Sequence, residues 1–331
     1  MELTTVWFSL IAVLWAGYFL LEGFDFGVGI LLPVLGRDDR ERRLLINTIG
    51  PVWDGNEVWL LVAGGATFAA FPEWYATLFS GFYLPLLLIL VALIVRGVAF
   101  EYRGKRDDAA WRRRWDACII AGSVVPALLW GVAFGNIVRG VRVDAAHEYV
   151  GGFFTLLNPY ALLGGLTTLT LFTLHGAVFL ALKTGGETRR RAGALAAALA
   201  GPVIVVAGGF LLWTAVAHHD PAGWALSAAA ALALAGAFVA ARARREGWAF
   251  LATGATIVLA TFALFVTLFP NVLPSSIDPA YSLTVTNASS TPYTLTVMTW
   301  VAVAFTPIVL AYQGWTYWVF RKRLTVEHIP G

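Results

Sequence analysis

Four carboxylates lie inside long apolar stretches of the sequence, in two pairs with the same spacing. Glu22 and Asp25 form the first pair, and Asp54 and Glu57 form the second. Residues three positions apart share one face of a helix, so each pair presents two acids to the same side. An ionisable side chain surrounded by hydrocarbon costs about 3 kcal/mol, which makes it a candidate functional residue by default. Because carboxylates stacked in this way can relay protons, we predict that these four form a proton pathway.

Two basic side chains occupy similar surroundings. Arg96 and His175 each lie within an apolar stretch. Arg96 could neutralise Asp25, and the pair would then fix helix packing rather than move protons. A lone buried histidine is most often a hydrogen-bonded core residue. The sequence therefore leaves open a structural or assembly role for Asp25, Arg96 and His175.

The chain that must position these residues is strongly apolar. Of its 331 residues 59% are hydrophobic and 13% are charged, and the mean hydropathy is +0.73. A soluble domain is about 25% charged. Apolar runs of about 20 residues, the length of a membrane-crossing helix, recur along the chain, and they do not alternate as strands would. We predict an all-α polytopic membrane protein that forms a single integral membrane domain over residues 1–331. Its nine expected spans are 5–35, 44–71, 76–101, 115–138, 155–182, 193–217, 223–241, 248–269 and 293–320.

Basic residues are concentrated in every second connection between these spans. Those connections, together with the segment that follows the last span, hold twenty of the 23 Lys and Arg residues, whereas the alternate connections hold only Arg139 and Arg142. Basic connections remain in the cytoplasm of a bacterial cell. We therefore expect a multi-pass protein of the bacterial inner membrane, with its N-terminus outside and its C-terminus in the cytoplasm. The connection 270–291 is expected to pack on the outer surface.

This topology places the two acidic pairs at matching depths. The first span should meet the cytoplasm near Leu35, and the second should enter from it near Leu44. Asp25 and Asp54 each lie ten residues from these points, or about 15 Å deep at the helical rise per residue. Glu22 and Glu57 lie one turn deeper. The four acids should therefore form a buried layer in the cytoplasmic half of the bilayer.

The sequence lacks the residues that a disulfide, a metal site or a haem site would need. The single cysteine, Cys118, excludes an internal disulfide and a thiolate cluster. Haem in a helical bundle needs axial His, Met or Cys ligands, and no facing pair can be assembled within the expected spans. We expect the chain to bind no metal or haem and to contain no catalytic residue of its own. The topology explains the net charge of +3, so nucleic acid is not an expected partner.

Two motifs carry a resemblance to a known family. The stretch 22–29 reads EGFDFGVG, and the stretch 50–59 reads GPVWDGNEVW. Both resemble subunit II of the cytochrome bd-type quinol oxidases. The stretch 96–103, RGVAFEYR, is also similar to that family. The match is dense over the first hundred residues and follows topology and length over the rest.

The resemblance implies a respiratory complex that oxidises quinol, reduces dioxygen to water and generates a proton motive force. Two b haems and one d haem would sit in the partner, subunit I. The fold would be two four-helix bundles with one peripheral helix. Asp54 would lie on a proton path, Trp59 near an oxygen access route, and Asp25 with Arg96 would support assembly. A quinone or lipid bound by this chain, and small accessory subunits, remain open.

Two other functions compete with this interpretation. A secondary transporter would show two related halves with broken helices at matched positions. The intramembrane acids occur only in the first two spans, which disfavours a transporter. The second alternative is a purely structural membrane subunit, in which the carboxylates only stabilise the fold.

Overall fold

The computed structural model describes residues 2–329, and within that range the chain folds into eleven α-helices. They are α1 (Leu3–Leu35), α2 (Asp39–Ile49), α3 (Trp53–Ala70), α4 (Pro72–Gly81), α5 (Tyr83–Tyr102), α6 (Ala109–Arg139), α7 (Pro159–Lys183), α8 (Gly186–His218), α9 (Pro221–Arg242), α10 (Glu246–Leu268) and α11 (Pro292–Val319). Eight of them are long and apolar enough to cross a membrane, and α2, α3 and α4 are not among these. The architecture is that of an all-helical polytopic membrane protein, as predicted.

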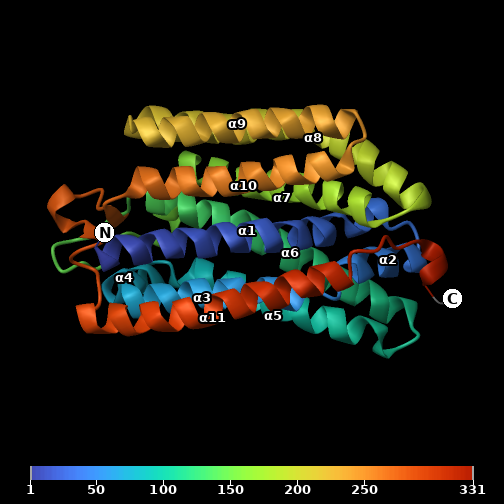
Figure 1. Cartoon of the computed structure of the whole chain (residues 1–331), viewed down its shortest axis with the longest axis horizontal. Coiled ribbons are helices and arrows are strands. Elements are labelled where there is room, and N and C mark those ends of the chain that lie inside the picture. Colours follow the sequence, from blue (N-terminus) through green and yellow to red (C-terminus); the bar gives the residue numbers. More distant parts are fainter. Residues whose placement is uncertain (1, 330–331) are drawn as a thin grey trace.

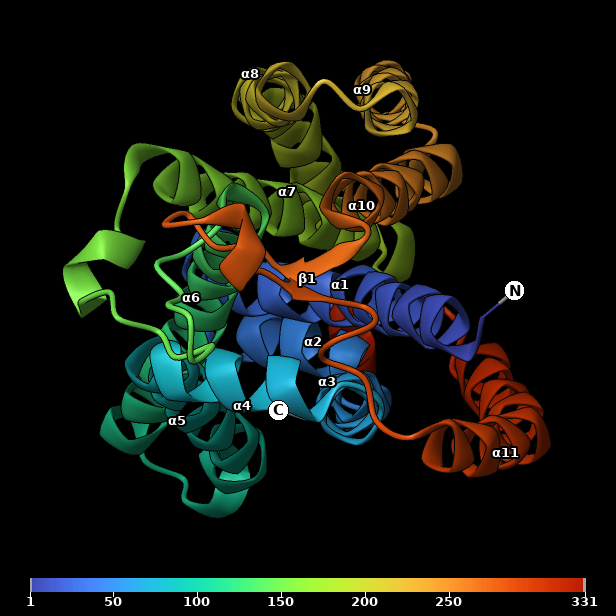
Figure 2. The same ribbon diagram turned by 90° about the vertical axis from the view of Figure 1, so that its left-hand side faces the viewer.

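The long helices run side by side along the longest axis of the molecule (Figure 1). The central helix is α1, which packs against α3, α6, α7 and α10. The view along the bundle shows α10 and α3 on opposite sides of α1 (Figure 2). At the margin, α11 touches α1 and α3, and Leu295 is its buried residue. The acids of α1 therefore lie in the middle of the molecule.

Two of the nine predicted segments are divided in the structure. The segment 44–71 consists of the end of α2 and the whole of α3, which are separated at Gly50, Pro51 and Val52. Proline lacks a backbone N–H and its ring clashes with the preceding turn, so a helix breaks there. The segment 76–101 overlaps α4 and α5, which meet at Phe82. The first turn of α3 is polar, and α3 is not among the eight helices that are apolar enough to cross a membrane. The nine predicted crossings therefore stay a prediction.

Glycines allow α1 and α7 to cross closely. A Cβ atom added to Gly27 would collide with the backbone of Phe172 and Gly176, and one added to Gly176 would collide with the backbone of Gly27. Small residues at a crossing let two membrane helices approach until their backbones touch. This contact fixes the carboxylate-bearing helix against the helix that carries His175.

One end of the bundle is covered by the connection between α10 and α11. Val272, Leu273 and Leu283 are buried there, so the segment packs on the bundle as expected. It contains two short strands, β1 (Asn271–Leu273) and β2 (Leu283–Thr284), paired antiparallel with Leu273 opposite Leu283. Both strands lie in a connection between helices, so the architecture of the long segments stays all-helical. The prolines of the segment disfavour a helix, and strand pairing satisfies its backbone groups instead.

The basic connections meet at the opposite end of the bundle, the right-hand end of Figure 1. Asp116 accepts hydrogen bonds from Arg42 at 2.9 Å and Arg103 at 2.5 Å, which ties the first basic connection to the second. Arg191 donates to Glu41 at 2.6 Å and joins the third connection to the first. Arg189 donates to Glu246 at 2.8 Å next to the fourth basic segment, and Lys183 donates to the Lys322 carbonyl at 3.1 Å in the fifth. All five basic segments thus share one end, as the topology prediction requires, while the orientation in a membrane stays a prediction.

Candidate functional site

A buried ion pair between α1 and α5 forms the innermost part of the site. Arg96 donates from Nη2 to Glu22 Oε1, and both side chains are fully buried. The guanidinium also lies over two aromatic rings, with its Cζ atom 4.7 Å from the centroid of Phe26 and 5.5 Å from that of Phe100. Removing either charge would leave the other unpaired in an apolar interior, which is costly.

This pairing corrects the partner expected for Arg96. The sequence suggested Asp25, but the ion pair that the structure places on Arg96 is with Glu22. Three residues turn a helix by about 300°, so Glu22 and Asp25 point in directions about 60° apart. That difference directs Glu22 to α5, while Asp25, also fully buried, faces α3. The two acids of α1 therefore contact different helices.

The partner of Asp25 is Asn56 on α3. Asn56 Nδ2 donates to Asp25 Oδ2 at 2.7 Å, and Asn56 is itself fully buried. Its Oδ1 accepts from the hydroxyl of Tyr317 at 2.7 Å and from Gln313 Nε2 at 3.3 Å. One amide thus connects α1, α3 and α11.

Sequence reasoning missed Asn56, Gln313 and Tyr317. Ionisable groups are not the only costly side chains in hydrocarbon, because an amide without a partner is also costly there. An Asn and a Gln within apolar stretches were the available signal. What the sequence could not supply was the proximity of α11, which lies more than 250 positions further along the chain than Asn56.

Asp54 and Glu57 lie outside this buried group. Asp54 is exposed and lines a cavity of about 500 Å³ between α3 and α11. Glu57 is half-buried, and its Oε2 atom is buried. Both Asp54 and Arg96 are near enough to interact electrostatically with Glu57. The expected buried layer of four acids is therefore wrong for Asp54, which sits at a cavity wall because α3 begins one residue before it.

Trp59 lines the same cavity and closes it toward α1. Its indole Nε1 donates to Gln313 Oε1 at 2.8 Å. The ring packs directly on Gly17, where a Cβ atom would collide with it. The cavity wall therefore contains both a fixed aromatic ring and Asp54.

His175 is hydrogen-bonded through both ring nitrogens. Nδ1 contacts Thr253 Oγ1 at 2.7 Å, Nε2 contacts the carbonyl oxygen of Leu20 at 3.2 Å, and the ring stacks on Phe250 with centroids 4.7 Å apart. These contacts join α7 to α1 and α10. In α8, His218 likewise contacts two backbone carbonyl oxygens at 3.0 and 3.1 Å. Neither histidine has a ring nitrogen free to bind haem iron, so these two residues do not fit that cofactor.

Several buried polar atoms of the site have no hydrogen-bond partner among the described residues. They include Glu22 Oε2, Asp25 Oδ1 and Glu57 Oε2, together with Nε and Nη1 of Arg96. Buried groups of this kind are rare and call for an explanation. Carboxylate oxygens without a protein donor can accept a proton. The arrangement therefore offers proton acceptors from the cavity wall to the centre of the bundle.

We expect Asn56→Leu to loosen α11. The variant keeps the approximate shape of the side chain but leaves Asp25 Oδ2 and the Tyr317 hydroxyl without their partner, a loss of about 1–3 kcal/mol. Hydrogen exchange of the α11 amides should become faster. Thr316→Val is the matched control, because the Thr316 hydroxyl bonds within its own helix to the Tyr312 carbonyl. Equal exchange in both variants would contradict the anchoring role.

Comparisons with known proteins agree over nearly the whole chain. A family model described as cytochrome bd terminal oxidase subunit II matches residues 3–320. Cytochrome bd ubiquinol oxidase subunit 2 of Bacillus subtilis is 44% identical, with 98% of this chain and 97% of that protein covered. Cytochrome bd-I ubiquinol oxidase subunit 2 of Escherichia coli is 39% identical, with 98% and 96% covered. The structure of bd oxidase from Geobacillus thermodenitrificans shares the fold, with a TM-score of 0.80, 18% identity and coverage of 97% and 99%.

Proposed function

Because the chain belongs to the cytochrome bd terminal oxidase subunit II family, we propose that it is the second subunit of a membrane-bound quinol oxidase. The complex would oxidise quinol, reduce dioxygen to water and generate a proton motive force. The observation that carries this proposal is the family match over residues 3–320, together with 44% identity to a relative named as that subunit.

The haems would reside in the partner, subunit I. They supply the electron transfer from quinol to dioxygen, and in this chain His175 and His218 both direct their ring nitrogens to protein oxygens instead. The role of the present chain is then to support that partner and to deliver protons. A quinone or lipid within this chain, and small accessory subunits, would be additions to this minimal pair.

The proposed placement is the bacterial inner membrane, with nine crossings in two four-helix bundles and one peripheral helix. The N-terminus would face outward and the C-terminus the cytoplasm. The gathering of the basic connections at one end supports this orientation, since such segments stay in the cytoplasm. The whole chain, residues 1–331, would form one integral membrane domain.

The proposed proton pathway begins at Asp54, on the cavity between α3 and α11. Glu57 would follow, since it interacts electrostatically with both Asp54 and Arg96. Glu22 and Asp25 would be the inner acceptors, because each keeps one buried oxygen without a partner among the described residues. The order runs from an exposed acid to fully buried ones, as proton delivery into a bundle requires.

The remaining residues take supporting roles in this proposal. Arg96 would neutralise Glu22, and Asp25 would hold α3 through Asn56, so both contribute to assembly. His175 would fix α7 against α1 and α10. Trp59 would border an oxygen access route along the cavity between α3 and α11.

Purification from the native membrane tests the proposed function. We expect the chain to co-purify with a haem-bearing membrane subunit, with a haem absorption spectrum and quinol-dependent oxygen consumption. A colourless protein without such a partner, and with substrate-coupled ion flux after reconstitution, would establish a transporter instead.

A further inference from the structure

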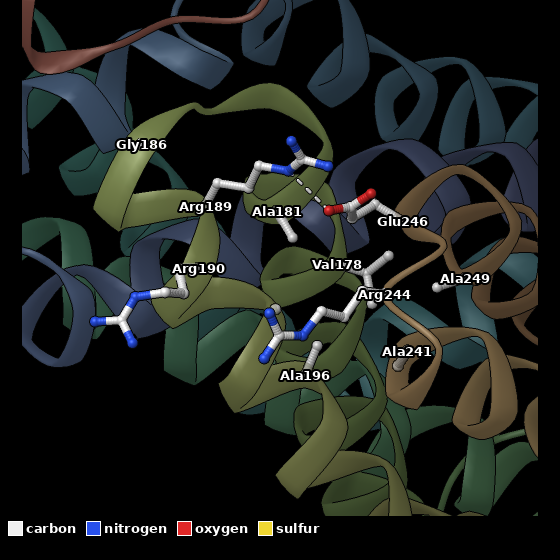
Figure 3. A pocket seen from close by; sticks show the side chains of 11 residues that line it. Val178, Ala181, Gly186, Arg189, Arg190, Ala196, Ala241, Arg244, Glu246 and Ala249 are labelled. Atoms are coloured by element: carbon white, nitrogen blue, oxygen red, sulfur yellow. Dashed lines mark hydrogen bonds and ion pairs between the residues drawn. The ribbon is translucent and has the colours of Figure 1, made fainter.

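A second cavity lies at the basic end of the bundle, between α7, α8 and the turn that joins α9 to α10 (Figure 3). Its volume is about 370 Å³, within the range of small-ligand sites. Most of its lining residues are alanines and glycines, and the lining also includes three arginines and one glutamate. It shares no lining residue with the cavity that contains Asp54.

Arg244 occupies an unusual backbone position at this cavity. Its φ angle is 53°, in the left-handed region that favours glycine, and its N–H donates to the Ala241 carbonyl at 3.1 Å to end α9. A side chain costs about 1–2 kcal/mol in that conformation, so a bulky residue there suggests a function. Among the described residues its guanidinium has no hydrogen bond or ion pair. Figure 3 shows it extending toward α8 near Ala196.

Arg189 supplies a second cation with free donors. Its Nε donates to Glu246 Oε1 at 2.8 Å, which fixes the side chain in place. That bond leaves both terminal nitrogens without a partner among the described residues. Arg190 differs, because Nε and Nη2 both donate to Glu187, at 2.8 and 2.7 Å, and Figure 3 shows its side chain directed away from the others. Two of the three arginines are therefore available to an anion.

The surface beside the cavity is apolar. Val239 on α9 and Trp248 and Leu251 on α10 are 63–66% exposed. Exposed apolar side chains on membrane helices face acyl chains, and tryptophan is enriched at the level of the lipid headgroups. An occupant of this site must therefore combine a negative group with apolar tails.

We propose that the cavity binds the phosphate of an anionic phospholipid through Arg189 and Arg244. Guanidinium groups match phosphate oxygens with paired hydrogen bonds, and basic sites between helices on the cytoplasmic side are suited to such headgroups. The small wall residues leave room for the headgroup, and the acyl chains lie along α9 and α10. The site is independent of the proposed proton pathway.

Native mass spectrometry of the purified two-subunit complex tests this site. The probes are dioleoyl phosphatidylglycerol, dioleoyl phosphatidylcholine and inorganic phosphate. We expect one phosphatidylglycerol to bind in preference to phosphatidylcholine, and the double variant Arg189→Gln, Arg244→Gln to bind it roughly tenfold more weakly. Arg190→Gln removes the same charge from the adjacent position and should bind normally.

Three results would overturn the proposal. They are equal weakening in Arg190→Gln, equal binding of phosphatidylcholine, and displacement of the lipid by inorganic phosphate at a similar concentration. If the double variant does not assemble, Arg244→Gln alone serves, since that side chain is exposed and has no described partner. Lipid binding is measured without turnover, so its failure is distinguishable from failure of the oxidase proposal, which is read from haem and oxygen consumption.

Discussion

We expect Asp54→Asn to lower quinol-driven oxygen consumption by roughly 100-fold, the scale of losing a positioned proton-transfer group. The amide keeps the size of the side chain but cannot carry a proton from the cavity to Glu57. Asp54 is exposed and has no role in the buried ion pair, so assembly should be unaffected. Oxygen uptake and the haem spectrum of the same preparation provide the measurement.

Two variants separate proton delivery from a change in the cavity. Asp54→Glu restores a carboxylate and should recover much of the activity. Thr306→Val, on the opposite wall of the same cavity, removes a hydroxyl but no acid and should stay near wild type. Loss of haem together with activity in Asp54→Asn would favour the purely structural subunit.

Arg96→Ala should prevent stable assembly. The change leaves Glu22 as an uncompensated charge in the interior and removes the cation from the rings of Phe26 and Phe100. Breaking a buried pair in this way costs about 3–5 kcal/mol, a large part of the stability of a typical domain. We expect little subunit II in the membrane and little haem in the complex, as measured by immunoblot and absorption spectrum.

The charge itself can be tested by a second change. Glu22→Gln combined with Arg96→Met removes both members of the pair, so no unpaired charge is left, and it should assemble better than Arg96→Ala. An assembled but inactive Arg96→Ala complex would assign Arg96 to proton transfer instead of assembly.

The helices that carry the buried polar residues were predictable from the sequence, whereas side-chain partners were not. The helical rise and the basic connections correctly indicated that α1 and α3 bring their polar residues together. Which acid Arg96 meets depends on the rotation of α1 about its axis, and spacing alone does not determine that rotation. The sequence therefore identified Glu22, Asp25 and Arg96 as buried charged residues but paired Arg96 with Asp25 instead of Glu22.

The exposed position of Asp54 has a different origin. A proline such as Pro51 permits a kink in a continuous helix, yet here the chain breaks and restarts as α3 at Trp53. Whether a proline bends or divides a helix depends on the packing around it, which a single sequence does not reveal. Because of the break, Asp54 lies in the first turn of α3 and borders a cavity formed with α11.

The central position of α1 has a consequence for biosynthesis. Arg96 follows Glu22 by 74 positions, so the ribosome adds it roughly 4–15 s later at ordinary translation rates. During that interval Glu22 lacks its partner Arg96, although hydrocarbon penalises an unpaired charge. The central helix α1 is thus synthesised before the helices that supply the partners of its buried acids. We therefore expect the stable integration of α1 to be completed only after α3 and α5 have been synthesised and have packed against it.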